Sequence, residues 1–264
     1  MMKKISLFCL FALFLIVGVN SFGQRVNPEH LQSLADLDTR TDLSKVTWAP
    51  LFDAKLTEFP VGLFKCKNLE YITISHSQIP SIPEEIVTAL PKLNRIELID
   101  CGLTEIPDVF YRIPNLKSIS LDENKITVIT DRINLMKNLE SFSLDKNGLN
   151  TIPENINLPK LHTLSLTDNQ LKALPDGIYG MKQLKLIHVS RNPITEVSPK
   201  IGDLTKLEHL DLSFTKIQSL PGSLKNCKKL KEVVILQTPL SGNSAEMEKF
   251  KSETGKQLAT GYRM

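Results

Sequence analysis

The amino-acid sequence predicts an α/β solenoid, in which stacked repeats build one parallel β-sheet. Three observations support this fold class. The chain matches itself when it is shifted by about 23 residues, apolar and polar residues alternate at the start of each copy, and an asparagine recurs at one position in four consecutive copies. The composition is that of a globular protein, because 41% of the 264 residues are hydrophobic and 23% are charged.

Residues 1–23 are predicted to be a secretory signal peptide. Lys3 and Lys4 precede an apolar run from Ile5 to Val19, and small and polar residues follow up to Gly23. The apolar run has about 15 residues, fewer than the roughly 20 that span a bilayer. We therefore expect cleavage after Gly23 and export to the periplasm or the extracellular space, with an uncleaved membrane anchor as the alternative.

The charge of the processed chain argues against two classes of partner. Removal of Lys3 and Lys4 leaves 30 basic and 29 acidic residues, a net charge of +1. Nucleic acids and anionic membranes attract proteins with a basic excess or a basic patch. The sequence thus predicts no nucleic-acid binding, and no stable membrane insertion once the signal peptide has been cleaved.

Residues 24–45 are predicted to form an N-terminal helical cap. In "NPEHLQSLADL" we expect Asn27 to be the N-cap, Pro28 the first helical residue and Glu29 part of the first turn. A helix of this kind covers the core that the first repeat of a solenoid leaves open. Its apolar face is predicted to consist of Leu31, Leu34 and Ala35.

Residues 46–240 are predicted to form the solenoid of about nine repeats, with successive spacings of 23, 24, 23, 23, 22, 23, 23 and 23 residues. The copies begin at Val46, Leu69, Leu93, Leu116, Leu139, Leu161, Leu184, Leu207 and Leu230. In "LHTLSL" the alternation around Leu164 and Leu166 puts leucines on one face of a short strand. One strand cannot bury them alone, so stacking the copies builds a parallel sheet over a continuous core.

A polar ladder is predicted where each strand ends. The turn at this point leaves inward-facing backbone groups without partners, and an asparagine side chain can both donate to them and accept from them. We expect a structural ladder of Asn124, Asn147, Asn169 and Asn192. The same position elsewhere holds residues that bond less well, namely Ala54, Ser77, Cys101, Thr215 and Thr238, so the ends of the ladder should be held less tightly.

The repeat L-x-x-L-x-L-x-x-N-x-L-x-x-L-P-x-x-I-x-x-L resembles the leucine-rich repeat family in its common 23-residue form, over about Val46 to Leu240. The resemblance implies a curved horseshoe with the parallel β-sheet on the concave face and short helical or irregular segments on the convex face. It also implies that the concave face binds a partner, usually a protein. The family has many unrelated partners, so the fold does not identify this one.

Residues 241–264 are predicted to form a C-terminal cap helix and a tail. The stretch "GNSAEMEKFKSETG" places Asn243 or Ser244 at the N-cap and turns Met247 and Phe250 toward the core. The tail after Gly255 is expected to be mobile. A partner-binding helix is the alternative interpretation of the same stretch.

The polar residues between the strand leucines are the candidate binding residues. Neighbouring strands lie about 4.8 Å apart, so equivalent residues of successive copies form columns across the concave face. Small hydroxyl side chains occupy the middle of these columns, and aromatic side chains occupy the N-terminal end. The predicted binding residues are Trp48, Tyr71, Thr73, Arg95, Glu97, Ser120, Asp122, Ser143, Asp145, Ser165, Thr167, His188, His209 and Asp211.

Three other interpretations remain open at this stage. Ser165, His188 and Asp211 follow one another in one column, in the order of a catalytic triad, which makes a hydrolase the alternative enzyme class. An acidic group could bind calcium or receive a basic partner; it comprises Glu97, Asp100, Asp122, Glu123, Asp145 and Asp168. A structural or adhesive surface component is the third. We predict a non-enzymatic protein-binding module with no cofactor and no metal.

Overall fold

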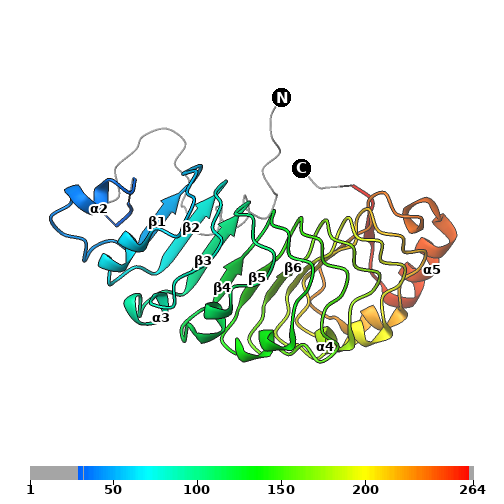
Figure 1. Cartoon of the computed structure of the whole chain (residues 1–264). Coiled ribbons are helices and arrows are strands. Elements are labelled where there is room, and N and C mark those ends of the chain that lie inside the picture. The colour runs from blue at the N-terminus through cyan, green and yellow to red at the C-terminus, as the bar shows by residue number, and fades with distance from the viewer. Residues whose placement is uncertain (1–28, 32, 262–264) are drawn as a thin grey trace, which may run out of the picture.

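The computed structural model describes residues 29–31 and 33–261, so the predicted signal peptide lies outside the described residues. Figure 1 shows a curved solenoid whose strands lie side by side in chain order on the concave face. Every neighbouring pair is parallel, which confirms the predicted α/β solenoid. The strands are β1 (Trp48–Leu51), β2 (Tyr71–Ser75), β3 (Arg95–Ile99), β4 (Ser118–Ser120), β5 (Ser141–Ser143), β6 (Thr163–Ser165), β7 (Leu186–His188), β8 (His209–Asp211), β9 (Glu232–Val234) and β10 (Leu258–Ala259).

Short helices carry the chain back along the other side of the solenoid. They are short because each repeat of about 23 residues must include a strand, two turns and the return segment. The α-helices are α2 (Asp36–Thr39), α3 (Ile86–Ala89), α4 (Asp176–Tyr179) and α5 (Ser244–Thr254). The 3-10 helices are η1 (Val61–Lys65), η2 (Asp108–Arg112), η3 (Asp131–Leu135), η4 (Pro199–Asp203), η5 (Gly222–Asn226) and η6 (Leu240–Gly242).

The core runs without interruption from the first repeat to the last, because the apolar positions of all repeats point into it. In the repeat that begins at Leu161, the side chains of Leu164, Leu166 and Leu171 are at most 1% exposed. Burying one such side chain contributes about 1.5–3 kcal/mol, and dozens of equivalent residues repeat the contribution. The stability of each repeat therefore depends on its two neighbours.

The asparagine ladder connects successive repeats. Asn169 Oδ1 accepts from the backbone N–H of Leu149 at 3.0 Å, and its Nδ2 donates to the carbonyls of Leu144 at 2.8 Å and Leu166 at 3.1 Å. One amide thus bonds groups of two repeats. Thr215, at the same position further along, makes one side-chain hydrogen bond, to the carbonyl of Leu212.

A row of left-handed residues runs along the solenoid beside the ladder. One residue per repeat, directly before the ladder position, has a φ between 50° and 59° without being a glycine. The row consists of Asp53, His76, Asp100, Glu123, Lys146, Asp168, Arg191, Phe214 and Gln237. This conformation costs about 1–2 kcal/mol per residue. From His76 to Phe214 it is retained because the backbone N–H then donates to a carbonyl of the next repeat, as from Glu123 to Asp145 at 2.8 Å.

The N-terminal cap differs from its prediction. Asn27 and Pro28 lie outside the described residues, and no helix begins at Glu29. Instead His30 forms a parallel bridge with Trp48, and the N–H of Leu31 donates to the carbonyl of Trp48 at 3.0 Å. Helix α2 begins later, at Asp36. The open edge of β1 offers unpaired backbone groups, and this part of the chain satisfies them as an extended segment rather than as a helical turn.

At the C-terminal end the predicted helix is present, but the segment after it differs from the prediction. Helix α5 begins after Asn243, whose side chain accepts from the N–H of Glu246, and Phe250 is 3% exposed. The predicted mobile tail is wrong for Leu258–Ala259, which form β10 beside β9. The exposed edge of β9 again explains the difference, because the carbonyl of Ala259 accepts from the N–H of Ile235.

Replacing Gly177 with alanine is expected to lower the free energy of unfolding by about 1–3 kcal/mol, the cost of overpacking a rigid contact. A Cβ atom on Gly177 would lie 2.5 Å from the carbonyl oxygen of Ile156 and 2.7 Å from that of Glu154. These are backbone atoms of the preceding repeat and cannot rotate away. Urea unfolding measures the effect.

The matched control is Gly242→Ala, because a Cβ at that position meets no atom within 4 Å. We expect Gly242→Ala to stay within about 0.5 kcal/mol of the wild type. Equal destabilisation by the two substitutions would contradict the close approach of the two repeats at Gly177.

Candidate functional site

The parallel register assembles the predicted binding residues on the concave face. In the first column Trp48, Tyr71 and Arg95 are direct partners on β1, β2 and β3. The second column brings together Thr73, Glu97, Ser120, Ser143, Ser165, His188 and Asp211 in strand order. His209 follows in the first column on β8, while Asp122, Asp145 and Thr167 come two residues after the second-column residues of β4, β5 and β6.

An aromatic stack occupies the N-terminal end of this face. The rings of Trp48 and Tyr71 are parallel to within 4°, with centroids 5.2 Å apart, and the guanidinium of Arg95 lies 5.1 Å from the Tyr71 centroid. Phe52 packs edge-on against Trp48 at 6.4 Å and is 52% exposed. We call these four residues the N-terminal aromatic stack. Stacking and cation–π contact hold its side chains in place.

Hydrogen bonds continue from the stack toward the centre of the face. Trp48 Nε1 donates to Thr73 Oγ1 at 3.3 Å, and Thr73 Oγ1 donates to Glu97 Oε2 at 3.3 Å. Burial raises the pKa of Glu97, against the lowering effect of its hydrogen bonds and of the Arg95 charge. Burial also raises the pKa of Tyr71, with a further contribution from the nearby Glu97 carboxylate. The stack and Glu97 therefore form one connected polar unit.

Two aspartates at the centre of the face bind the repeat that follows each of them. Asp122 Oδ1 accepts from Ser143 Oγ at 2.6 Å and from the N–H of Asp145 at 2.9 Å. Asp145 Oδ1 repeats this with Ser165 Oγ at 2.6 Å and the N–H of Thr167 at 2.7 Å. We call Asp122 and Asp145 the carboxylate ladder. Each aspartate thus fixes the start of the next turn in addition to being a candidate binding residue.

The carboxylate ladder is poorly solvated. Asp122 is 0% exposed and Asp145 is 4% exposed. Burial raises the pKa of Asp122 to about 6, against hydrogen bonds that lower it, and the charge of Glu97 adds to the rise. Burial raises the pKa of Asp145 as well, and the charge of Asp122 is the next largest cause. The two carboxyl groups therefore hold protons at a higher pH than ordinary aspartates do.

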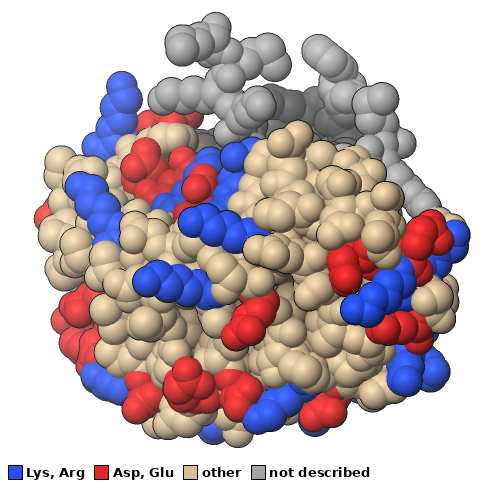
Figure 2. All heavy atoms as spheres, turned by 90° about the vertical axis from the view of Figure 1, so that its right-hand side faces the viewer, with Lys and Arg blue, Asp and Glu red and all other residues tan. Residues whose placement is uncertain are grey.

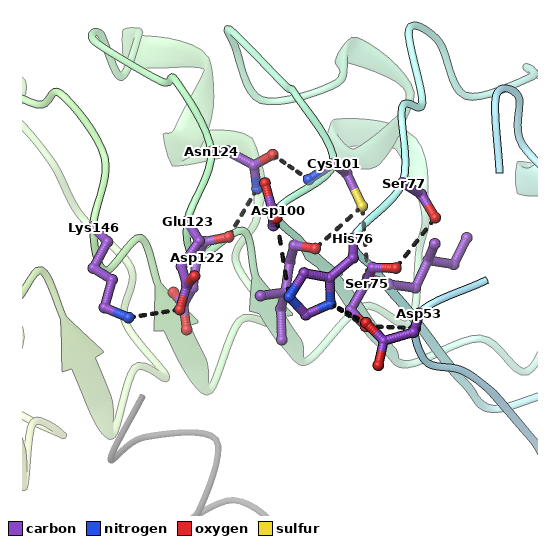
Figure 3. Close-up of polar contacts among 12 residues, drawn as sticks. Asp53, Ser75, His76, Ser77, Asp100, Cys101, Asp122, Glu123, Asn124 and Lys146 are labelled. Atoms are coloured by element: carbon purple, nitrogen blue, oxygen red, sulfur yellow. Dashed lines mark hydrogen bonds and ion pairs between the residues drawn. The ribbon is translucent and has the colours of Figure 1, made fainter. Parts of the chain in front are cut away.

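A second line of charges lies along the row of left-handed residues (Figure 3). His76 Nδ1 lies 2.7 Å from Asp53 Oδ1, and its Nε2 lies 3.9 Å from Asp100 Oδ2. Further along, Lys146 Nζ lies 2.6 Å from Glu123 Oε1, beside Asp122. These side chains form a charged rim along the carboxyl ends of the strands. Asp100 and Glu123, which the sequence placed in the acidic group, therefore have partners on the rim.

The row of Ser165, His188 and Asp211 does not have the contacts of a triad. The three residues are in register on β6, β7 and β8, but Ser165 Oγ donates to Asp145 Oδ1, on the side away from His188. Asp211 Oδ1 accepts from the N–H of Ser213 at 2.9 Å. Burial lowers the pKa of His188, although the Asp211 charge opposes it. The hydroxyl that would act as nucleophile is committed to a structural hydrogen bond.

The described part of the chain has few features that point to other classes of site. Among residues 29–31 and 33–261, no group of three or more His, Cys, Asp or Glu side chains is placed to hold a metal ion. Within the same residues, no helix has the length and hydrophobicity needed to cross a bilayer. Figure 2 shows that Lys, Arg, Asp and Glu side chains are interspersed on the C-terminal end of the molecule, so this face carries no large field of one sign.

Sequence reasoning missed the structural role of the carboxylate ladder. The signal was present as Ser-Leu-Asp at the same place in two successive copies, Ser120 to Asp122 and Ser143 to Asp145, followed by Ser165 in the third. A hydroxyl and a carboxylate in adjacent columns of neighbouring strands can form a hydrogen bond from one repeat to the next. The row of left-handed residues was missed too, because it contains none of the glycines or asparagines that usually mark this conformation.

Comparisons with known proteins give the same architecture. A family model described as "Leucine rich repeat" matches residues 137–194 and 159–217. The chain is 37% identical, over 162 residues, to the protein flightless-1 homolog of Caenorhabditis elegans, and the match covers 60% of this chain and 13% of that protein.

Solved structures are similar over most of the chain. An internalin (inlF) from Listeria monocytogenes str. 4b F2365 matches with a TM-score of 0.66 and 18% identity, covering 84% of this chain and 63% of that one. A chain from the octameric complex of Latrophilin 3, Unc5D and FLRT2 (LRR) matches with a TM-score of 0.60 and 25% identity. The match covers 74% of this chain and 68% of that one. This chain thus spans less than two thirds of the flightless-1 homolog and of the internalin chain.

Proposed function

Because this chain is a leucine-rich repeat protein, we propose that it is a non-catalytic binding module whose concave face receives a protein partner. The N-terminal aromatic stack carries this proposal. Trp, Tyr and Arg side chains dominate the energetics of protein interfaces, especially where they are held rigidly before binding. Here the stack lies at one end of a face of neighbouring strands lined with hydroxyl groups, a surface broad enough for an extended segment or a folded partner.

Two further observations support a protein partner and export. In the solved complex that contains FLRT2 (LRR), the partners are other proteins, Latrophilin 3 and Unc5D. The sequence of residues 1–23 has the layout of a secretory signal peptide. We therefore propose that the processed chain begins at Gln24 and acts in the periplasm or outside the cell. The hydrolase alternative is disfavoured because the hydroxyl of Ser165 bonds Asp145.

A capture experiment with three versions of the processed chain, Gln24 to Met264, tests the proposal. The concave variant carries Phe52→Ala, Arg95→Ala and His209→Ala, which spare the asparagine and carboxylate ladders. The control variant carries Arg112→Ala, Leu135→Ala and Lys200→Ala, three side chains on the helical side. We expect the wild type and the control to capture the same protein from native extracts, and the concave variant to capture at least about tenfold less of it.

Circular dichroism and the midpoint of thermal unfolding check that the three versions are equally folded. Equal capture by all three versions would contradict binding through the concave face. If none of the three versions captures a protein above the bead background, the proposal of a stable protein partner is contradicted.

A further inference from the structure

One edge of the solenoid is basic. Because every strand pair is parallel, the strands from β1 to β9 all begin at the same edge (Figure 1). Each of these nine strands is preceded by a two-residue turn and two connecting residues, as Lys137 and Asn138 precede β5. Eight of the nine turns contain at least one lysine, and none of the nine contains an aspartate or a glutamate. The turns therefore form a continuous basic line along this edge.

Most of this positive charge is not neutralised. Of the nine lysines in the turns, two form ion pairs, Lys45 with Asp42 and Lys182 with Asp203. Lys206 is half-buried and donates a hydrogen bond to a neutral amide. The other six lysines are exposed and have no ion-pair partner among the described residues. We call these six the lysine edge, and they are Lys67, Lys92, Lys137, Lys160, Lys228 and Lys229.

The acidic residues that balance the lysine edge lie elsewhere. At the opposite edge, the row of left-handed residues contains four acidic and two basic side chains. In the column of residues directly before the strands, three lysines are balanced by three glutamates, and Lys117 pairs with Glu140 and Lys231 with Glu208. The small net charge of the processed chain therefore conceals a separation of charge between the two edges of the solenoid.

Hydrogen bonds fix the turns of this edge to one another. The side-chain amide of Asn138 donates to the carbonyl of Pro114 at 3.1 Å, and the amides of Asn68 and Asn115 make the equivalent bonds. Each bond joins one turn to the turn of the preceding repeat. With strands about 4.8 Å apart, the lysine edge extends over about 34 Å from its first to its last member. The lysines are thus flexible side chains on a rigid, evenly spaced support.

The charge of the edge acts on a neighbouring histidine. His162 lies directly before β6, in the column next to the turns. Burial lowers the pKa of His162, and the charges of Lys185 and Lys206 lower it further, although the Glu140 carboxylate opposes them. Lysines that disfavour a protonated histidine favour an anion at the same place. The electrostatic potential at this part of the edge is therefore positive.

We propose that the lysine edge binds a linear polyanionic polysaccharide, one that carries sulfate or carboxylate groups along its chain. Lysine presents a single, strongly hydrated charge on a flexible stem, which suits hydrated anions that repeat along a polymer. The described turns contain no aromatic or large aliphatic side chain that could insert into a bilayer or anchor a protein interface. The inference goes beyond the proposed function and concerns a different surface. It takes only export from that proposal, which brings the chain to polysaccharides rather than to nucleic acids.

Binding to three polymers tests the inference. Dextran sulfate presents sulfate groups, polygalacturonate presents carboxylates, and dextran is the uncharged control. We expect the wild-type chain, Gln24 to Met264, to bind at least one of the charged polymers in biolayer interferometry and not to bind dextran. Lysine–anion contacts release counterions, so raising the NaCl concentration from about 50 to about 200 mM is expected to weaken the Kd by at least about tenfold.

Two variants with the same loss of charge locate the site. The edge variant neutralises three members of the lysine edge, with Lys92→Gln, Lys137→Gln and Lys160→Gln. The opposite-edge variant neutralises three exposed lysines near the asparagine ladder, with Lys125→Gln, Lys172→Gln and Lys216→Gln. We expect the edge variant to bind the charged polymer at least about tenfold more weakly than the wild type, and the opposite-edge variant to stay within about twofold. The midpoint of thermal unfolding checks that both variants are folded.

Several results would overturn the inference. They are equal weakening by the two variants, equal binding of dextran and the charged polymers, and binding of neither charged polymer. Wild-type binding to phosphatidylglycerol vesicles that is tighter than binding to either polymer, and is lost in the edge variant, would make the edge a membrane-docking surface instead. Each of these results leaves the concave-face proposal untouched.

The concave variant of the capture experiment separates the two proposals. We expect it to bind the charged polymer as the wild type does, because it retains the whole lysine edge. Loss of polymer binding in the concave variant, with binding retained in the edge variant, would place the polyanion on the concave face and overturn the inference. Failure of the capture experiment with normal polymer binding would contradict the proposed function alone.

Discussion

Asn124→Ala is expected to lower the free energy of unfolding by about 3–5 kcal/mol, because one amide satisfies five buried backbone groups and each orphaned group costs about 1–3 kcal/mol before relaxation. The Asn124 side chain accepts from two N–H groups, and its two Nδ2 hydrogens are shared among three carbonyls. Its partners are Cys101 N at 3.0 Å, Leu103 N at 3.0 Å, Leu98 O at 2.7 Å, Leu121 O at 2.9 Å and Asp122 O at 3.1 Å. Urea unfolding followed by circular dichroism measures the loss.

Asn115→Ala is the matched control, since the exposed Asn115 amide donates a single hydrogen bond, to the carbonyl of Pro91. We expect it to cost less than about 1 kcal/mol. Hydrogen exchange should also accelerate at the amides of Cys101 and Leu103 in Asn124→Ala, and not in Asn115→Ala. A difference between the two variants of less than about 1 kcal/mol would show that the ladder is not a major source of stability.

The second large effect is expected from Asp122→Asn and depends on pH. The pKa of Asp122 is about 6 in the folded chain, above the value of 3.8 for an ordinary aspartate. The folded state therefore binds more protons than the unfolded state between these values, and the contribution of Asp122 to stability is lost as the pH rises from about 4 through 6. A rise of about two pKa units corresponds to about 3 kcal/mol.

We therefore expect Asp122→Asn to become more stable than the wild type as the pH rises, by about 2–2.5 kcal/mol at pH 7.5 relative to the difference at pH 4. Asparagine keeps the acceptor that Ser143 and Asp145 use, and its NH₂ group can donate to Ser120 Oγ in place of the contact that Ser120 makes with the carboxylate. Urea unfolding at several pH values measures the difference. The control Asp203→Asn removes an exposed carboxylate from η4, on the helical side. The free energy of unfolding of Asp203→Asn should depend on pH as that of the wild type does. A pH-independent difference between Asp122→Asn and the wild type would show that Asp122 is not protonated near pH 6.

The solenoid could be predicted because the spacing of the apolar residues specifies its core. Leu164 and Leu166 alternate with polar residues, and this alternation fixes both the strand and the face that it buries. The two ends could not be predicted in the same way, because they depend on edges that exist only after the sheet has formed. His30 and Ala259 adopt extended conformations in order to bond β1 and β9, and nothing in their local sequence requires it.

The candidate site could be predicted as a set of columns but not as a set of contacts. The register that places Trp48, Tyr71 and Arg95 side by side follows directly from the repeat. The depth of Asp122 does not, since its burial depends on the next repeat and on the local path of the chain. For this reason the small hydroxyl and acidic residues were predicted only as exposed binding residues. In the structure, several of them form hydrogen bonds between repeats.

The row of left-handed residues has a consequence for how this protein can change over evolutionary time. Each repeat ends its strand with the same backbone conformation, and from His76 to Phe214 the left-handed residue donates to the same carbonyl of the next repeat, whatever side chain it carries. A whole repeat can therefore be duplicated or deleted while every junction keeps its geometry. Such an event would move the aromatic stack and the carboxylate ladder apart or together in steps of about 4.8 Å. Gain or loss of one repeat between them would thus change the spacing of these two groups, without any substitution in either group.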